Sequence, residues 1–186
     1  MMPFYLQGVL GYKPSQIGLI MLPTAITITI IGPLAGRLSD KYGWRRFNLA
    51  GLTLSATGLY VLSRLSDTSA VTLVIVAMVL QAAGNGLFNA PNAASIFSAA
   101  ENNKHGVVSA LLSLVRNSAN VTSVAVATTI VTATMFSLGY APDLGDIRIS
   151  EDAGVLSAFV SGLRLLYLIM GSVLLIGIVL QGFAED

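Results

Sequence analysis

Five long apolar stretches, separated by short polar segments, dominate the hydropathy pattern of this chain. Each contains about 20 or more mostly apolar residues, which is the length that an α-helix needs to cross about 30 Å of hydrocarbon. Because a bilayer core offers no water to backbone groups, such stretches are expected to be helical. The pattern therefore predicts membrane spans at residues 15–38, 47–65, 70–98, 107–136 and 155–181.

The first 14 residues are apolar in part but too short to form a span. They have no basic region followed by a full apolar core, so they do not match a secretory signal peptide. We interpret them as the tail of a preceding helix that is truncated upstream of Met1. Residues 1–186 are then expected to form a single, incomplete transmembrane helical domain.

The composition supports a membrane protein. Hydrophobic residues make up 54% of the chain and charged residues only 10%, whereas soluble domains carry roughly 25% charged residues. The net charge of +1 argues against a nucleic-acid partner, because such partners select a basic face. There is no cysteine, no metal-spaced histidine cluster and no nucleotide-binding or nucleophile motif. The sequence therefore predicts an all-α membrane protein without a cofactor, a metal or an enzyme activity.

Basic residues cluster after the first predicted span, in the stretch "GPLAGRLSDKYGWRR" at residues 32–46. Cytoplasmic loops of membrane proteins carry an excess of lysine and arginine. The cluster therefore assigns the segment 39–46 to the cytoplasm and predicts a multi-pass protein of the cell membrane.

The same stretch is expected to form a loop of about eight residues between two antiparallel helices. Gly36 and Gly43 would permit close backbone approach and a tight reversal. Asp40 would accept hydrogen bonds from an arginine or from a neighbouring helix N-terminus and so close the cytoplasmic side. The alternative is a topology signal combined with a simple turn.

The spacing within this stretch resembles the signature loop of the major facilitator superfamily, roughly G-x-L-x-D-R/K-x-G-R/K-R/K. The matching positions are Gly36, Leu38, Asp40, Lys41, Gly43, Arg45 and Arg46. Trp44 stands where the signature often has a basic residue. The stretches "GLFNAPNAASIFSA" and "GVVSALLSLVRNSANV" are similar to the C-terminal half of the 14-helix drug:proton antiporter branch.

The resemblance implies a partial transporter bundle, the C-terminal half of a secondary active transporter. Two helical halves of such a protein rock around a site near the bilayer midplane. It also implies a missing N-terminal half as partner, small organic compounds as exported substrates and protons as the coupling ion. No span contains a deep carboxylate, so the titrating acid is expected in that missing half.

Two spans carry polar residues on one helical face. The third span has four amides and the fourth has an arginine with two asparagines: Gln81, Asn85, Asn89, Asn92, Arg116, Asn117 and Asn120. Amides that face lipid are costly, so these faces should meet protein or water. Asn89 and Arg116 each lie about nine residues from the cytoplasmic end of their spans, at a common depth of about 14 Å.

These polar faces admit two interpretations. They line a substrate path, or they hold helices together by hydrogen bonds worth about 0.6 kcal/mol each. Arg116 likewise serves either a substrate or a structural partner. In the last span, Arg164 is expected to extend its side chain toward the outer surface.

Two alternatives to a transporter stay open at this level. The small-residue faces suit a scaffold of five spans that assembles with partners and transports nothing. A partial gene product is the other alternative, because five spans are an odd remnant of a symmetric fold.

Overall fold

A computed structural model of the chain describes residues 1–101, 104–141, 144, 147 and 152–183. Within these residues the helices are α1 (Met2–Phe4), η1 (Tyr5–Val9, a π-helical turn), α2 (Pro14–Tyr42), α3 (Trp44–Leu62), α4 (Val71–Ser98), α5 (His105–Ser137) and α6 (Ala153–Phe183). The described part contains no strand, which confirms the prediction of an all-α protein.

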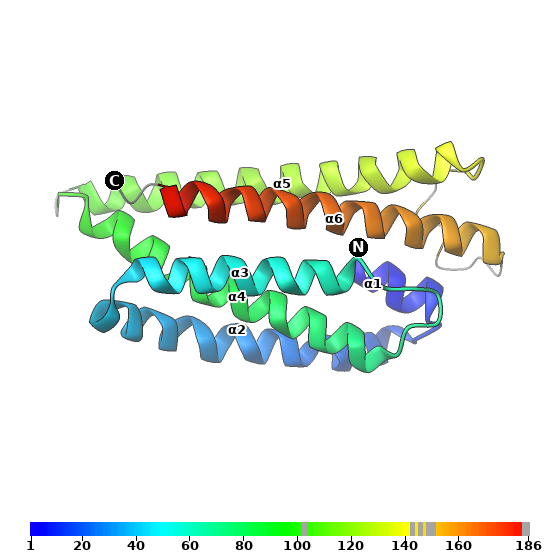
Figure 1. The fold of residues 1–186 in the computed structure, drawn as a ribbon, viewed down its shortest axis with the longest axis horizontal. Coiled ribbons are helices and arrows are strands. Elements are labelled where there is room, and N and C mark those ends of the chain that lie inside the picture. The colour runs from blue at the N-terminus through cyan, green and yellow to red at the C-terminus, as the bar shows by residue number, and fades with distance from the viewer. Residues whose placement is uncertain (102–103, 142–143, 145–146, 148–151, 184–186) are drawn as a thin grey trace.

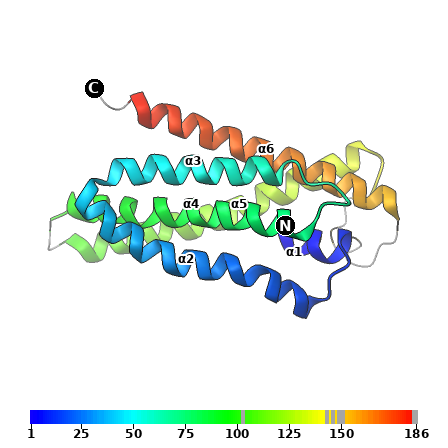
Figure 2. The same ribbon diagram turned by 60° about the horizontal axis from the view of Figure 1, so that its bottom comes forward.

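The five long helices run side by side along the long axis of the molecule (Figure 1). Helix α4 packs against α2 on one side and α3 on the other, and α6 packs against both α3 and α5. Figure 2 accordingly shows α3 and α4 between α2 and α6. Helix α5 makes few contacts with α4 although the two are consecutive.

Four of the described helices are long and apolar enough to cross a membrane, namely α2, α4, α5 and α6. They match four of the five predicted spans. The predicted span at 47–65 forms α3, which is helical but is not among these four. Polar and small residues dilute its apolar character, and several of them are buried against neighbouring helices, including Asn48, Gly51 and Ser55. That α3 also crosses the membrane therefore stays a prediction.

The link between α2 and α3 corrects the expected eight-residue loop. Helix α2 continues through Asp40 and Lys41 to Tyr42, and α3 begins at Trp44. Gly43 alone separates the two helices, with φ 88° and ψ 136°. A backbone with this φ is costly for residues that carry a Cβ, so the glycine permits the reversal within one residue.

Glycines set the close packing of α3 on α4. A Cβ added to Gly51 would lie 2.7 Å from the carbonyl oxygen of Gly84, and one on Gly58 would lie 2.7 Å from the Gln81 nitrogen. At such distances only the absence of a side chain allows the two backbones to approach. The Gly32–Gly36 pair of α2 lies in a looser contact with α4, because a Cβ on Gly36 would meet Ala90 only at 3.8 Å.

The largest buried cluster lies toward the end of the bundle opposite Gly43, where the short N-terminal helices meet α5 and α6. Tyr5, Phe159 and Met135 are fully buried there. The Tyr5 hydroxyl donates a hydrogen bond of 2.7 Å to the Ser66 carbonyl oxygen after α3. Residues 2–9 are thus helical and packed. That they end a longer helix remains a prediction.

Candidate functional site

A cavity of about 260 Å³ lies where α2, α4 and α5 face one another. Three of the predicted polar residues line it, Asn85 and Asn89 from α4 and Arg116 from α5. The remaining lining residues are mostly small or apolar: Ile28, Gly32, Gly86, Ala90 and Ala93. The cavity therefore combines an apolar wall with a few convergent polar groups, the composition typical of small-molecule sites.

The two asparagines of α4 bond to each other. The Asn89 side-chain amide donates to the Asn85 side-chain oxygen and, at 3.1 Å, to the Asn85 backbone oxygen. One helical turn separates the residues, which places both on one face of α4. This pairing orients the amides but leaves both side chains exposed to the cavity.

Arg116 provides the single positive charge among the residues that line this cavity. Its side chain is exposed, and it makes no hydrogen bond or ion pair with the described residues. A guanidinium carries five donors in a planar fork that suits carboxylate and phosphate groups. Arg116 and Asn89 line the same cavity, in line with the common depth expected from their positions.

The other residues of the predicted polar faces lie outside this cavity. Gln81 is half-buried where α4 packs on α3, and its backbone oxygen accepts a hydrogen bond of 3.4 Å from Ser55. Asn92 is half-buried one turn beyond Asn89, while Asn117 and Asn120 are exposed. Asn117 and Asn120 do not reach the cavity because α5 diverges from α4. This divergence leaves every residue from Ser113 to Val126 exposed.

The apolar part of the cavity was missed by sequence reasoning. Gly32, Gly86 and Ala90 were visible only as small residues in apolar spans. A Cβ on Gly86 would lie 3.2 Å from Ile31, so this glycine brings α4 close to α2. Small residues spaced by four in adjacent spans were the available signal.

The charged turn lies at the end of the bundle formed by the C-terminus of α2 and the N-terminus of α3. Asp40, Lys41 and Arg46 are exposed there, and the Lys41 ammonium lies 5.4 Å from the centre of the Tyr42 ring. Asp40 makes no hydrogen bond or ion pair with any residue that the structure describes. Its carboxylate thus remains available to a partner beyond these helices.

Metal ligation finds no support in the described residues. No group of three or more histidine, aspartate or glutamate side chains comes together there. The polar groups of the cavity are amides and a guanidinium, which are not typical ligands of transition metals.

Several characterised and uncharacterised transporters are similar to this chain. The uncharacterized transporter YebQ of Escherichia coli is 35% identical over 115 residues, 62% of this chain and 25% of that protein. The riboflavin transporter RibZ of Clostridioides difficile is 31% identical over 117 residues, 63% of this chain and 26% of that protein. The multidrug resistance protein Stp of Mycobacterium tuberculosis is 34% identical over 112 residues, 60% of this chain and 21% of that protein.

The chain spans about a quarter of the length of these relatives. No solved structure matches it. The family model of the Major Facilitator Superfamily matches residues 1–184, which is almost the entire chain. With its apolar helices, this match shows a multi-pass membrane protein that belongs to the major facilitator superfamily of transporters.

Proposed function

We propose that this chain is the C-terminal part of a secondary active transporter that exports small organic compounds. The observation that carries the proposal is the cavity in which Asn85, Asn89 and Arg116 converge between α2, α4 and α5. A cavity between helices near mid-span is where alternating-access transporters bind their substrates. Proton coupling and a complementary N-terminal half are parts of the same proposal.

The chemistry of the cavity suits substrates that are mostly apolar with a polar or anionic group. The apolar wall of Ile28, Ala90 and Ala93 would contact hydrocarbon or aromatic parts. The amides and Arg116 would orient a carbonyl, hydroxyl or acidic group. Relatives named as a riboflavin transporter and a multidrug resistance protein are compatible with this class of substrate.

The turn around Gly43 would supply the closing contact on the cytoplasmic side. Asp40 is exposed and lacks a partner among the described residues, so it is placed to pair with helix ends of the other half. Gly36, Lys41, Gly43, Arg45 and Arg46 form the rest of this gating turn in the proposal. Exposed ion pairs contribute about 0–1 kcal/mol, which suits a contact that opens and closes in each cycle.

The test is efflux of a fluorescent anionic or zwitterionic dye by the full-length transporter in proteoliposomes with a pH gradient. Arg116→Gln and Asn89→Leu are expected to lower efflux about tenfold or more, the effect of losing one or two oriented polar contacts. Asn117→Leu is the matched control, because Asn117 is exposed on α5 outside the cavity lining.

Equal effects of the cavity variants and the control would contradict a substrate path and favour polar residues that only hold helices together. An absence of efflux in the unsubstituted, correctly inserted protein would favour a non-transporting scaffold. Efflux that continues unchanged when the pH gradient is dissipated would contradict proton coupling but not the other parts of the proposal.

A further inference from the structure

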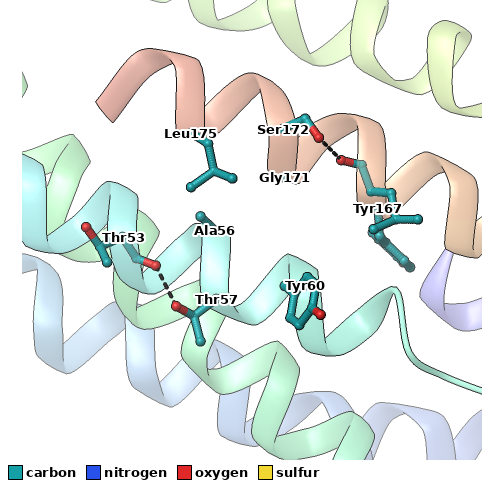
Figure 3. Close-up of a pocket in the computed structure, with 9 residues that line it drawn as sticks. Thr53, Ala56, Thr57, Tyr60, Tyr167, Gly171, Ser172 and Leu175 are labelled. Carbon is teal, nitrogen blue, oxygen red and sulfur yellow. Dashed lines mark hydrogen bonds between the residues drawn. The ribbon is translucent and has the colours of Figure 1, made fainter. Parts of the chain in front are cut away.

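A second, larger hollow lies on the opposite face of the bundle from the Arg116 cavity, between α3 and α6. It encloses about 370 Å³ and is shown in Figure 3. Ala56 and Tyr60 from α3 face Gly171 and Leu175 from α6 across it. None of the residues of the proposed substrate cavity lines it, so it is a separate feature.

The hydroxyl groups around this groove are already used by their own helices. Thr53 donates to the Leu49 carbonyl oxygen at 2.7 Å and Thr57 donates to that of Thr53 at 2.8 Å. Ser172 donates to the Leu168 carbonyl oxygen at 2.8 Å. Because these donors are occupied, the groove offers an occupant mainly hydrocarbon contacts.

The open side of the groove faces the surroundings of the bundle. Tyr60, Leu168 and Leu175 keep 51%, 45% and 56% of their surface exposed. From Tyr167 to Leu175 the groove extends over about 12 Å of helix rise, while one leaflet of a bilayer is about 15 Å of hydrocarbon. The groove thus has nearly the length of the apolar part of one lipid chain.

Two arginines lie at one end of the groove. The Arg64 guanidinium carbon lies 4.9 Å from the centre of the Tyr60 ring, and the same group donates a hydrogen bond to the Tyr60 hydroxyl. Arg164 Nε donates to the Leu65 carbonyl oxygen at 2.5 Å, one residue from Arg64. Arg164 precedes Leu168 by one helical turn, so it belongs to the helix face that lines the groove.

The two guanidiniums are not neutralised within the part of the chain that the structure describes. Both arginines are exposed, and neither forms an ion pair with a described carboxylate. Asp67 is the acidic group in the α3–α4 connection, and both it and Arg164 act electrostatically on Tyr5. Two guanidiniums that have no ion-pair partner among the described carboxylates suit a phosphate.

We propose that the α3–α6 groove binds an anionic phospholipid, with one acyl chain between Tyr60 and Leu175 and the headgroup phosphate at Arg64 and Arg164. An apolar groove of leaflet depth that ends in guanidiniums matches the two ends of such a lipid. A guanidinium binds phosphate oxygens through its planar fork of donors in either leaflet. The opposite side of the lipid would remain in contact with the bilayer.

The test compares phosphatidylglycerol with phosphatidylcholine, both with oleoyl chains, on the full chain purified in detergent. Native mass spectrometry counts the lipid molecules retained per protein. Phosphatidylglycerol is expected to be retained in preference to phosphatidylcholine, and Arg64→Gln should lower this preference about five-fold, the effect of one basic side chain near an anionic surface. Lys13→Gln is the matched control for loss of one exposed cation outside the groove.

A second pair of variants tests the acyl-chain contact without changing charge. A Cβ on Gly171 would meet only Leu59, at 3.9 Å, so Gly171→Leu should fold and fill the groove. Gly177→Leu adds the same side chain to α6 at a position with no atom within 4 Å. Gly171→Leu should lose the retained lipid, and Gly177→Leu should keep it.

Three results would overturn the proposal. They are equal retention of the two lipids, equal effects of Arg64→Gln and Lys13→Gln, and retention unchanged by Gly171→Leu. Displacement of the phospholipid by 10-fold excess of a transported dye would instead assign the groove to substrate. Because no variant touches the Arg116 cavity, failure here leaves the proposed transport function untouched, and failure of transport leaves this lipid site intact.

Discussion

Asp40 is an exposed carboxylate without a described partner at the tip of α2. Among the described residues Lys104 and Glu101 form an ion pair at 2.8 Å, whereas Asp40 has no such partner there. Asp40 is thus sterically available for the interaction with the other half that we propose for this turn.

Asp40→Asn in the full-length transporter is expected to lower transport about tenfold while membrane insertion stays normal. The substitution keeps the shape but removes the charge that a partner N–H or guanidinium would bind. Closure of the two halves would partly bury this contact and raise its worth from about 0–1 kcal/mol for an exposed pair to about 1.5–3 kcal/mol. Transport in vesicles and the amount of inserted protein are the two measurements. Glu101→Gln serves as a control, because Glu101 is an exposed acid paired only with nearby Lys104. Normal transport by Asp40→Asn would show that the turn is only a topology signal.

At the scale of single elements, glycines decide how closely α3 and α4 approach. A Cβ on Gly84 would lie 2.5 Å from the carbonyl oxygen of Gly51 and would collide with Ser55 as well. Both partners are on α3, so the contact cannot relax by rotating one flexible side chain. The glycines at this contact thus set how closely the backbones of α3 and α4 approach.

Gly84→Ala is expected to destabilise the protein by about 1–3 kcal/mol, the cost of inserting a methyl group into a packed interface. Gly18→Ala in α2 should instead stabilise the protein by about 0.5–1 kcal/mol, because glycine destabilises a helix interior relative to alanine. The added Cβ would have no atom within 4 Å, so it would cause no collision. Unfolding of the detergent-solubilised protein by a denaturing detergent measures both. Equal stability of the two variants would contradict the close packing of α3 on α4.

At the scale of the whole molecule, large apolar side chains remain exposed along the outer helices. Examples are Leu19, Ile26 and Ile30 of α2 with 66%, 54% and 60% of their surface exposed, and Leu180 of α6 with 64%. Apolar surface of this extent requires a bilayer, detergent or further protein to cover it. The first half of α5, exposed on all sides, is the part that most needs such cover.

The purified chain is therefore expected to be monodisperse in detergent or lipid nanodiscs and to aggregate when detergent is removed. The reason is the unfavourable hydration of exposed apolar surface, about 25 cal/mol for each Å². Size-exclusion chromatography with light scattering measures the state before and after removal. A monodisperse peak in plain buffer would contradict the membrane assignment.

Much of the fold was predictable because hydropathy and helix length are local properties of the chain. Four predicted spans correspond to α2, α4, α5 and α6 within a few residues. The predicted eight-residue loop was wrong, because the charge and polarity at Asp40 and Arg45 do not end a helix. Polar residues continue a helix readily outside the hydrocarbon, and only the backbone at Gly43 breaks it.

The candidate site was predictable in part. Helical spacing placed Asn85 and Asn89 on one face, and depth related Asn89 to Arg116; all three line one cavity. Spacing also grouped Gln81 and Asn120 with them, and the structure separates these residues. Periodicity reports the face of one helix, but not which neighbour that face meets.

The amino-acid sequence by itself determined that the protein lies in a bilayer, where its helices run and to which family it belongs. The length of the apolar stretches, the content of charged residues and a short signature can each be read along one chain. The tertiary structure alone decided the α3–α6 groove, the divergence of α5 from α4 and the selection of three polar residues for one cavity. These features depend on distances between helices, which are set where glycines such as Gly51 and Gly84 let two backbones meet. No local pattern contains that information, because it arises only when separate segments pack together.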